Sequence, residues 1–335
     1  MGETQNTSKI AEDIFKKIFK FLYWEVCKPS NINFSCVKCE PKDEEGKQSG
    51  RVYHKNHGTH PVDGVFYYKD PYLGKYIYLN TDFKSYAAQT INKNKIKSCL
   101  VSLAETISCA NVSEEWKNKF CCIEADIEVR GLIFLYNHDY SYEKNIEDIL
   151  SSISISDIHI DNEQYIHFLD PLTINRIYSM IRDIESFNFR HYSFHYPNKR
   201  LSKNVISNQI NPPLPCTIES LHSPYIIIQY QSMEGENGYL IYYNELGKTK
   251  QEFLYFLDYI TGVQIYFDKN LIIKATSQSL DDNATSNFEM AKQEYLMQWN
   301  YSDVIVENLK NLELEVVDQV IPSFITRIQG WNELA

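Results

Sequence analysis

Two aspartates and a lysine in the first third of the chain have the types and spacing of a site that hydrolyses phosphate esters. Asp63 begins one β-prone run, residues 63–69, and Asp82 and Lys84 lie at the end of the next, about 75–83. Both runs are rich in Tyr, Val and Ile, the residues that favour strands. We therefore expect a hairpin that carries these three side chains.

The turn of this hairpin sets the register of its strands. Asp-Pro-Tyr-Leu-Gly at 70–74 is a turn by composition. If Asp70 faces Lys75, Asp63 stands opposite Asp82, and their side chains lie about 5 Å apart on one face of the sheet. Lys84 shares that face, because side chains alternate along a strand.

Two carboxylates placed face to face repel each other unless a cation lies between them. At 4 Å and an effective dielectric of 20 the repulsion is about 4 kcal/mol. Mg²⁺ or Mn²⁺, which prefers oxygen ligands, offsets it. Such a cation suits phosphodiester hydrolysis, with Lys84 positioning or activating the attacking water. The alternative is an exposed hairpin with Asp63, Asp82 and Lys84 at its rim and no catalytic role.

The surrounding segments predict an α/β core. An amphipathic helix is expected over residues 8–23, followed by a short strand at 24–27. After the hairpin come a helix at about 85–109 and a buried strand at 131–136. The order is α-β-β-β-α-β.

This order, with Pro61-Val62-Asp63 and Asp82-Phe83-Lys84, resembles the PD-(D/E)xK, or restriction-endonuclease-like, nuclease superfamily over about residues 8–138. The resemblance implies a metal-dependent nuclease that uses Asp63, Asp82 and Lys84. It also implies that the backbone carbonyl of Phe83 completes the metal shell.

Two further residues enter through the resemblance alone. Glu12 matches the position of a helix glutamate that binds metal in Mrr-type enzymes, although Ala11 replaces the aromatic residue that often precedes it. An acid in the first turn of a helix is also common for electrostatic reasons. Gln89 lies just over one helical turn past Lys84, where a polar residue often contacts substrate.

The rest of the chain predicts a mixed α/β region. We expect a nuclease core at 1–140, an extension with a linker at 141–210, and a partner- or target-binding domain at 211–335, where the segment 225–230 suits an interface unless it is core. A single nuclease core with a large second half resembles effectors of bacterial anti-phage defence, which usually act with a second protein subunit. The unevenly placed cysteines, with the adjacent pair Cys121 and Cys122, predict a reducing, cytoplasmic compartment. An oligomer is expected. No apolar run approaches the roughly 20 residues that a membrane-spanning helix needs, so no membrane span is expected.

The net charge of −11 argues against a protein that coats nucleic acid through a broad basic surface. A confined basic groove is possible at residues 93–97 or 199–203, although solvated lysines explain both runs. DNA is the favoured substrate. An RNA or tRNA endonuclease with the same site, and an inactive nuclease-like binding or assembly subunit, are the alternatives.

The cysteines and histidines allow a second kind of metal site. Cys36-x-x-Cys39 with His54 and His57 has a spacing near that of a small zinc site, although such pairs also occur by chance. His60 is expected to be a buried or loop histidine. The end of the buried strand carries His138 and Asp139, which either touch substrate or, for Asp139, cap the following helix.

Overall fold

The computed structural model describes residues 14–38, 58–121, 123, 126–158, 160–197, 212–265, 267, 270–276, 280–299 and 301–320. The chain forms two compact units, Met1–Ile174 and Asn175–Ala335, and each is described by itself. The three-part division expected from the sequence stays a prediction.

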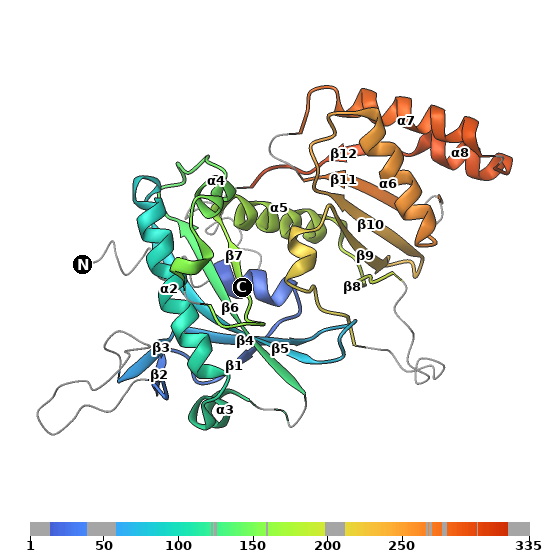
Figure 1. The fold of residues 1–335 in the computed structure, drawn as a ribbon. Coiled ribbons are helices and arrows are strands. Elements are labelled where there is room, and N and C mark those ends of the chain that lie inside the picture. Colours follow the sequence, from blue (N-terminus) through green and yellow to red (C-terminus); the bar gives the residue numbers. More distant parts are fainter. Residues whose placement is uncertain are drawn as a thin grey trace, which may run out of the picture. The chain divides into compact units, whose positions relative to one another are not determined.

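Unit 1 is built on a five-stranded mixed sheet with the order β1-β4-β5-β6-β7 (Figure 1). A helix over residues 14–21 leads into the sheet, and the α-β-β-β-α-β order of the core is confirmed. The elements are β1 (Glu25–Cys27), β2 (Ile32–Ser35), β3 (Thr59–Val62), β4 (Gly64–Lys69), β5 (Tyr76–Tyr86), α2 (Lys93–Ala110), α3 (Glu114–Phe120), β6 (Ile127–Asn137), α4 (Ile146–Ser151) and β7 (Ile166–Leu169).

The predicted hairpin register is confirmed. The Asp70 carboxylate accepts hydrogen bonds of 2.8 Å from the backbone N–H groups of Tyr72 and Leu73, which fixes the turn. The ladder then pairs Lys69 with Tyr76 and continues to Gly64 and Thr81, as the sequence predicts. It stops there, because the backbone bends at Asp63 between β3 and β4.

Strand β5 continues past the end of β4. Its last five residues, from Asp82 to Tyr86, pair in parallel with β6 from Ile133 to Asn137. The prediction of a helix from residue 85 is therefore wrong: the parallel ladder keeps this segment extended, and α2 begins only at Lys93. The side chain of Asn92 caps that helix by accepting from the Lys95 N–H.

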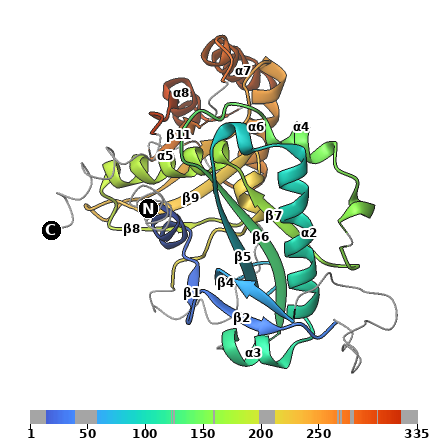
Figure 2. The same cartoon turned by 90° about the vertical axis from the view of Figure 1, so that its left-hand side faces the viewer.

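Helices cover both faces of the sheet. On one face the ring of Phe15, from the first helix, stacks on Phe83 of β5 at 3.9 Å between centroids. On the other face α2 packs on Ile133 and Leu135 of β6. Figure 2 shows α2 running beside β6. Asp82 and Lys84 lie in register with Ile133 and Leu135, so they share the α2 face.

Unit 2 contains a second five-stranded sheet, ordered β12-β11-β10-β9-β8. Its strand β9 contains the segment 225–230. Ile226, Ile227 and Ile228 are buried, so this segment belongs to the core and does not supply the interface that the sequence suggested. The elements are α5 (Pro171–Phe187), which begins at the end of unit 1, β8 (His191–Phe194), β9 (Tyr225–Gln231), β10 (Asn237–Tyr243), α6 (Lys250–Gly262), β11 (Leu271–Ala275), α7 (Ala284–Gln298), α8 (Asp303–Asn311) and β12 (Leu314–Val316).

Within the described ranges, none of the helices combines the length and the apolar character that crossing a membrane requires.

Candidate active site

The bend at Asp63 brings its carboxylate to the free edge of β5. Asp63 Oδ2 accepts a 2.9 Å hydrogen bond from the backbone N–H of Phe83. It thus takes the place of the β4 partner that ends at Gly64. In an extended strand the N–H and C=O of one residue point to the same edge. The Phe83 carbonyl therefore faces the same side as Asp63.

Asp82 and Lys84 form an ion pair on the α2 face of β5. The Lys84 ammonium donates to Asp82 Oδ1. The side chains of Asp82 and Lys84 are only 17% and 28% exposed, respectively. They are therefore partly buried. The non-catalytic alternative instead requires these two side chains to lie at an exposed rim.

The electrostatics of the three side chains are coupled. The pKa of Asp82 is raised to about 6. Burial is the largest cause, the ion pair with Lys84 opposes it, and the nearby Asp63 carboxyl group, which shares a hydrogen bond with Asp82, adds a smaller upward shift. Burial lowers the pKa of Lys84, but the charges of Asp82 and Asp63 outweigh this, so the net shift is upward. Lys84 is thus an ammonium ion at neutral pH.

This donor set fits a hard divalent cation. The raised pKa of Asp82 shows that its negative charge is costly in this site, chiefly because of burial and to a smaller extent because of the Asp63 carboxyl group beside it. Asp63, Asp82 and the Phe83 carbonyl supply oxygen ligands alone, the type that Mg²⁺ and Mn²⁺ prefer.

The other predicted site residues have different outcomes. Glu12 lies outside the described residues, so its role as a ligand stays a prediction. Gln89 is exposed in a short 3₁₀ turn, Ala88–Thr90, rather than on the expected helix. Among the predicted basic residues, Lys97 pairs with Asp157 at 2.8 Å, and Lys199, Arg200 and Lys203 lie outside the described residues.

Two contacts near the site follow from the extra length of β5. The Lys95 ammonium lies 4.9 Å from the centroid of the Tyr86 ring, at the end of the strand. Ser85 Oγ lies 3.2 Å from His138 Nδ1. The sequence does not predict the contact of Tyr86 with Lys95, because the expected helix places both residues on one continuous element.

Asp139 has a capping role, though not the predicted one. The backbone N–H of Ala88 donates a hydrogen bond to the Asp139 carboxylate and lies 3.1 Å from each of its two oxygens. The Asn137 side chain donates a further hydrogen bond to the same carboxylate. It therefore caps the 3₁₀ turn after β5 instead of the helix that follows it in sequence. The Asn137 side chain also donates to the Tyr86 carbonyl at 2.9 Å, which ties the ends of β5 and β6 together.

The zinc site suggested by the spacing of Cys36, Cys39, His54 and His57 stays a prediction. Cys39, His54 and His57 lie outside the described residues. Cys36 instead lies beside Cys109 of α2 and His60 of β3, whose side chain is buried as expected.

Comparison with known proteins adds one match. The family described as "GAPS4 protein PD-(D/E)XK nuclease domain" matches residues 1–173, about half of the chain. No curated protein and no solved structure matches.

Proposed function

The chain belongs to the family of the GAPS4 protein PD-(D/E)XK nuclease domain, and from this premise we propose that it is a Mg²⁺-dependent endonuclease that cleaves DNA in anti-phage defence. The observation that carries the proposal is that three side chains, Asp63, Asp82 and Lys84, lie together where β4 begins. Asp63 bonds the backbone of β5, and Asp82 and Lys84 meet beside it. The partly buried ion pair distinguishes this arrangement from an ordinary surface hairpin.

Each group has a definable task in phosphodiester hydrolysis. Asp63, Asp82 and the Phe83 carbonyl would hold the cation, with Glu12 as a further ligand. When bound, Mg²⁺ supplies positive charge to the phosphate oxygens and acidifies water. Lys84 carries its proton at neutral pH, so it acts as a hydrogen-bond donor that orients the attacking water or the phosphate. Asp82 holds the ammonium in place.

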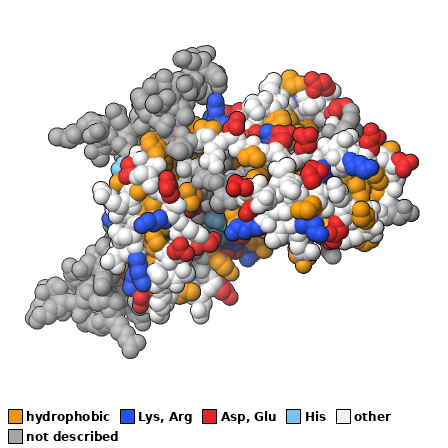
Figure 3. All heavy atoms as spheres, turned by 90° about the horizontal axis from the view of Figure 1, so that it is seen from above, with side chains coloured by type: hydrophobic (Ala, Val, Ile, Leu, Met, Phe, Trp, Pro, Cys, Tyr) orange, Lys and Arg blue, Asp and Glu red, His pale blue; other side chains and the backbone are white. Residues whose placement is uncertain are grey.

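We also propose that a second protein subunit completes the active form. On the face drawn in Figure 3, acidic and basic side chains of the described residues are interspersed rather than gathered into one broad basic surface. Unit 2 exposes large apolar side chains on its helices, including Tyr255 at 64%, Val304 at 67% and Met297 at 86%. Residues about 200–335 are the proposed docking region, because apolar surface of this kind suits a protein interface.

The test is incubation of the full chain with plasmid DNA and with total RNA, in Mg²⁺, Mn²⁺ or EDTA. Lys84→Ala serves as the inactive control. We expect metal-dependent cleavage of DNA that the variant lacks and that is slow in the chain alone, because the proposed second subunit is absent. Cleavage of RNA alone would reassign the substrate and keep the site. Cleavage that persists in EDTA or in Lys84→Ala would contradict the proposed chemistry.

A further inference from the structure

A second cluster of potential metal ligands lies in unit 1, formed by Cys36, His60 and Cys109. Cys36 directly follows β2, His60 lies in β3, and Cys109 lies near the end of α2. One ligand atom from each residue lies within 4.8 Å of the others. His60 and Cys109 are buried, and Cys36 is half-buried. The three residues come from three elements that are far apart in the sequence.

The geometry suits a tetrahedral ion better than a disulfide. The two Sγ atoms lie 3.5 Å apart. A disulfide requires about 2.05 Å, whereas two thiolates that bind one zinc at about 2.3 Å lie about 3.8 Å apart. Burial raises the pKa of the Cys109 thiol to about 11, and hydrogen bonds from the backbone N–H groups of Val37 and Lys38 oppose this shift only in part. Cys109 is therefore a thiol in the metal-free chain, and binding of a cation would release its proton.

A hydrogen-bond chain orients the histidine. The Thr106 hydroxyl donates to the Ser102 carbonyl at 2.9 Å, so its oxygen can accept from His60 Nδ1, which lies 3.4 Å away. This assigns the proton to Nδ1 and the lone pair to Nε2. Metal-binding histidines commonly donate their other N–H in this way.

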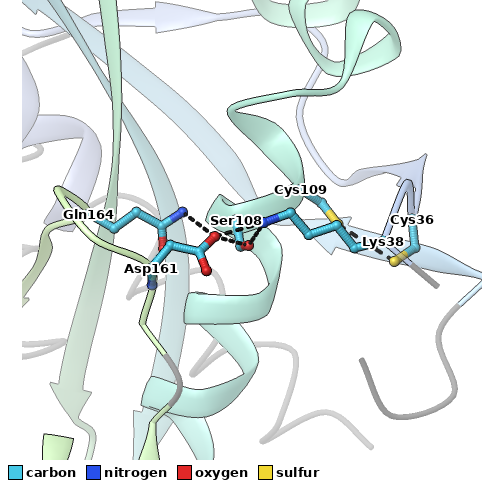
Figure 4. Close-up of polar contacts among 6 residues, drawn as sticks. All are labelled: Cys36, Lys38, Ser108, Cys109, Asp161 and Gln164. Carbon is cyan, nitrogen blue, oxygen red and sulfur yellow. Dashed lines mark hydrogen bonds and ion pairs between the residues drawn. The ribbon is translucent and has the colours of Figure 1, made fainter. Parts of the chain in front are cut away.

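A polar clamp holds the Cys36 segment against α2 (Figure 4). Lys38 donates to Ser108, the neighbour of Cys109, and pairs with Asp161 at 2.7 Å. Ser108 also donates to Asp161, which lies 3.5 Å from the side-chain nitrogen of Gln164. These contacts hold the segments that carry Cys36 and Cys109 close together, and none of them involves either sulfur atom.

We propose that Cys36, His60 and Cys109 bind a structural Zn²⁺ ion that fastens the β2–β3 hairpin to α2. Two thiolates and one imidazole form a donor set that selects zinc over Mg²⁺, and a water molecule would fill the fourth position of the tetrahedral ion. The ion anchors β3, which ends one residue before Asp63. The site is separate from the catalytic centre and does not depend on the proposed nuclease activity.

The test is the metal content of the full-length chain, expressed without a metal-affinity tag in zinc-supplemented medium and dialysed against EDTA. We expect about one zinc per chain by elemental analysis. Cys36→Ser, Cys109→Ser and His60→Ala should each lose at least half of it. Two controls should keep it: Cys27→Ser, a buried cysteine of the same core, and Asp82→Ala, which removes a ligand of the other proposed site.

A second measurement does not depend on folding of the variants. Wild-type protein loaded with Co²⁺ should show thiolate-to-cobalt charge-transfer absorption and the visible bands of a tetrahedral ion. X-ray absorption of the zinc form should show sulfur and nitrogen neighbours. A folded, metal-free chain would overturn the proposal. So would a shell of oxygen atoms alone, or a Cys36–Cys109 disulfide in the freshly isolated protein.

Discussion

The Lys84 ammonium donates a hydrogen bond to the carboxylate of Asp82, which lies two residues earlier on the same face of β5. Loss of either partner should abolish the site while keeping the fold, because neither side chain belongs to an apolar core. We expect Asp82→Ala and Lys84→Ala each to reduce cleavage at least about a hundredfold, as when a metal ligand or water-positioning group is lost. Initial cleavage rates at saturating Mg²⁺ measure the effect.

The matched control is Lys117→Ala, which breaks an exposed ion pair with Glu114 on α3. Its rate should equal that of the wild type, because an exposed pair of this kind contributes little. Full activity of either site variant would contradict the assignment.

The metal-free chain should lose stability as the pH rises from about 4 to about 6. The folded-state pKa of Asp82 is raised to about 6, so the folded protein binds the proton more tightly than the unfolded chain does. Deprotonation of Asp82 over this range therefore lowers the free energy of unfolding, by at most on the order of 3 kcal/mol. Above pH 6 this loss stays constant.

Asp82→Asn lacks this titration. In EDTA its free energy of unfolding should match the wild type near pH 4 and equal or exceed it at pH 7, measured by chemical denaturation at each pH. A variant less stable than the wild type at pH 7 but not at pH 4 would contradict the proposed burial cost.

Glu12→Gln should raise the Mg²⁺ concentration that half-maximal cleavage requires. Replacing a carboxylate ligand by an amide removes one negative charge from the metal shell. The maximal rate at saturating Mg²⁺ should fall less than in Asp82→Ala. An unchanged metal titration would assign Glu12 to the ordinary role of an acid at a helix start.

The isolated chain should bind DNA weakly at physiological salt. Its net charge of −11 repels a polyanion, and Lys97 is already engaged by Asp157. We expect a dissociation constant above micromolar by fluorescence anisotropy, with tighter binding at low salt. Submicromolar binding by the monomer alone would refute the requirement for a second protein.

Local patterns in the sequence are sufficient to predict the hairpin. Asp70 and Gly74 identify the turn, and the turn then sets every pair of the β4–β5 ladder. The turn residues therefore set the pairing as far as Gly64 and Thr81, whereas the bend that brings the Asp63 carboxylate to the Phe83 N–H lies beyond the ladder. The seven-residue helix α3 is also within reach of such patterns, because Ser113 caps it and Trp116 and Phe120 lie one turn apart on its buried side.

Contacts between distant segments are not predictable in this way. The extension of β5 to Tyr86 depends on parallel pairing with β6, about fifty residues later, and nothing in residues 82–86 announces that partner. The spacing of Cys36 favours nearby Cys39 as its partner, but its described neighbour Cys109 is 73 positions away. The periodicity of apolar residues in the sequence shows which residues share one helix or strand. Contacts such as that of Cys36 with Cys109 depend instead on how separate elements pack against each other.

Strand β5 is longer than its pairing with β4, and this makes the backbone amide of Phe83 a measure of where the Asp63 carboxylate lies. From Tyr76 to Thr81 the strand has a neighbour on both edges, but at Phe83 the N–H bonds a side chain, Asp63, in place of a strand. Hydrogen–deuterium exchange at this amide should thus follow the position of a single carboxylate. Asp63→Ala should speed it strongly and leave Leu79 slow, which would report the geometry of the site in a chain that has neither substrate nor partner.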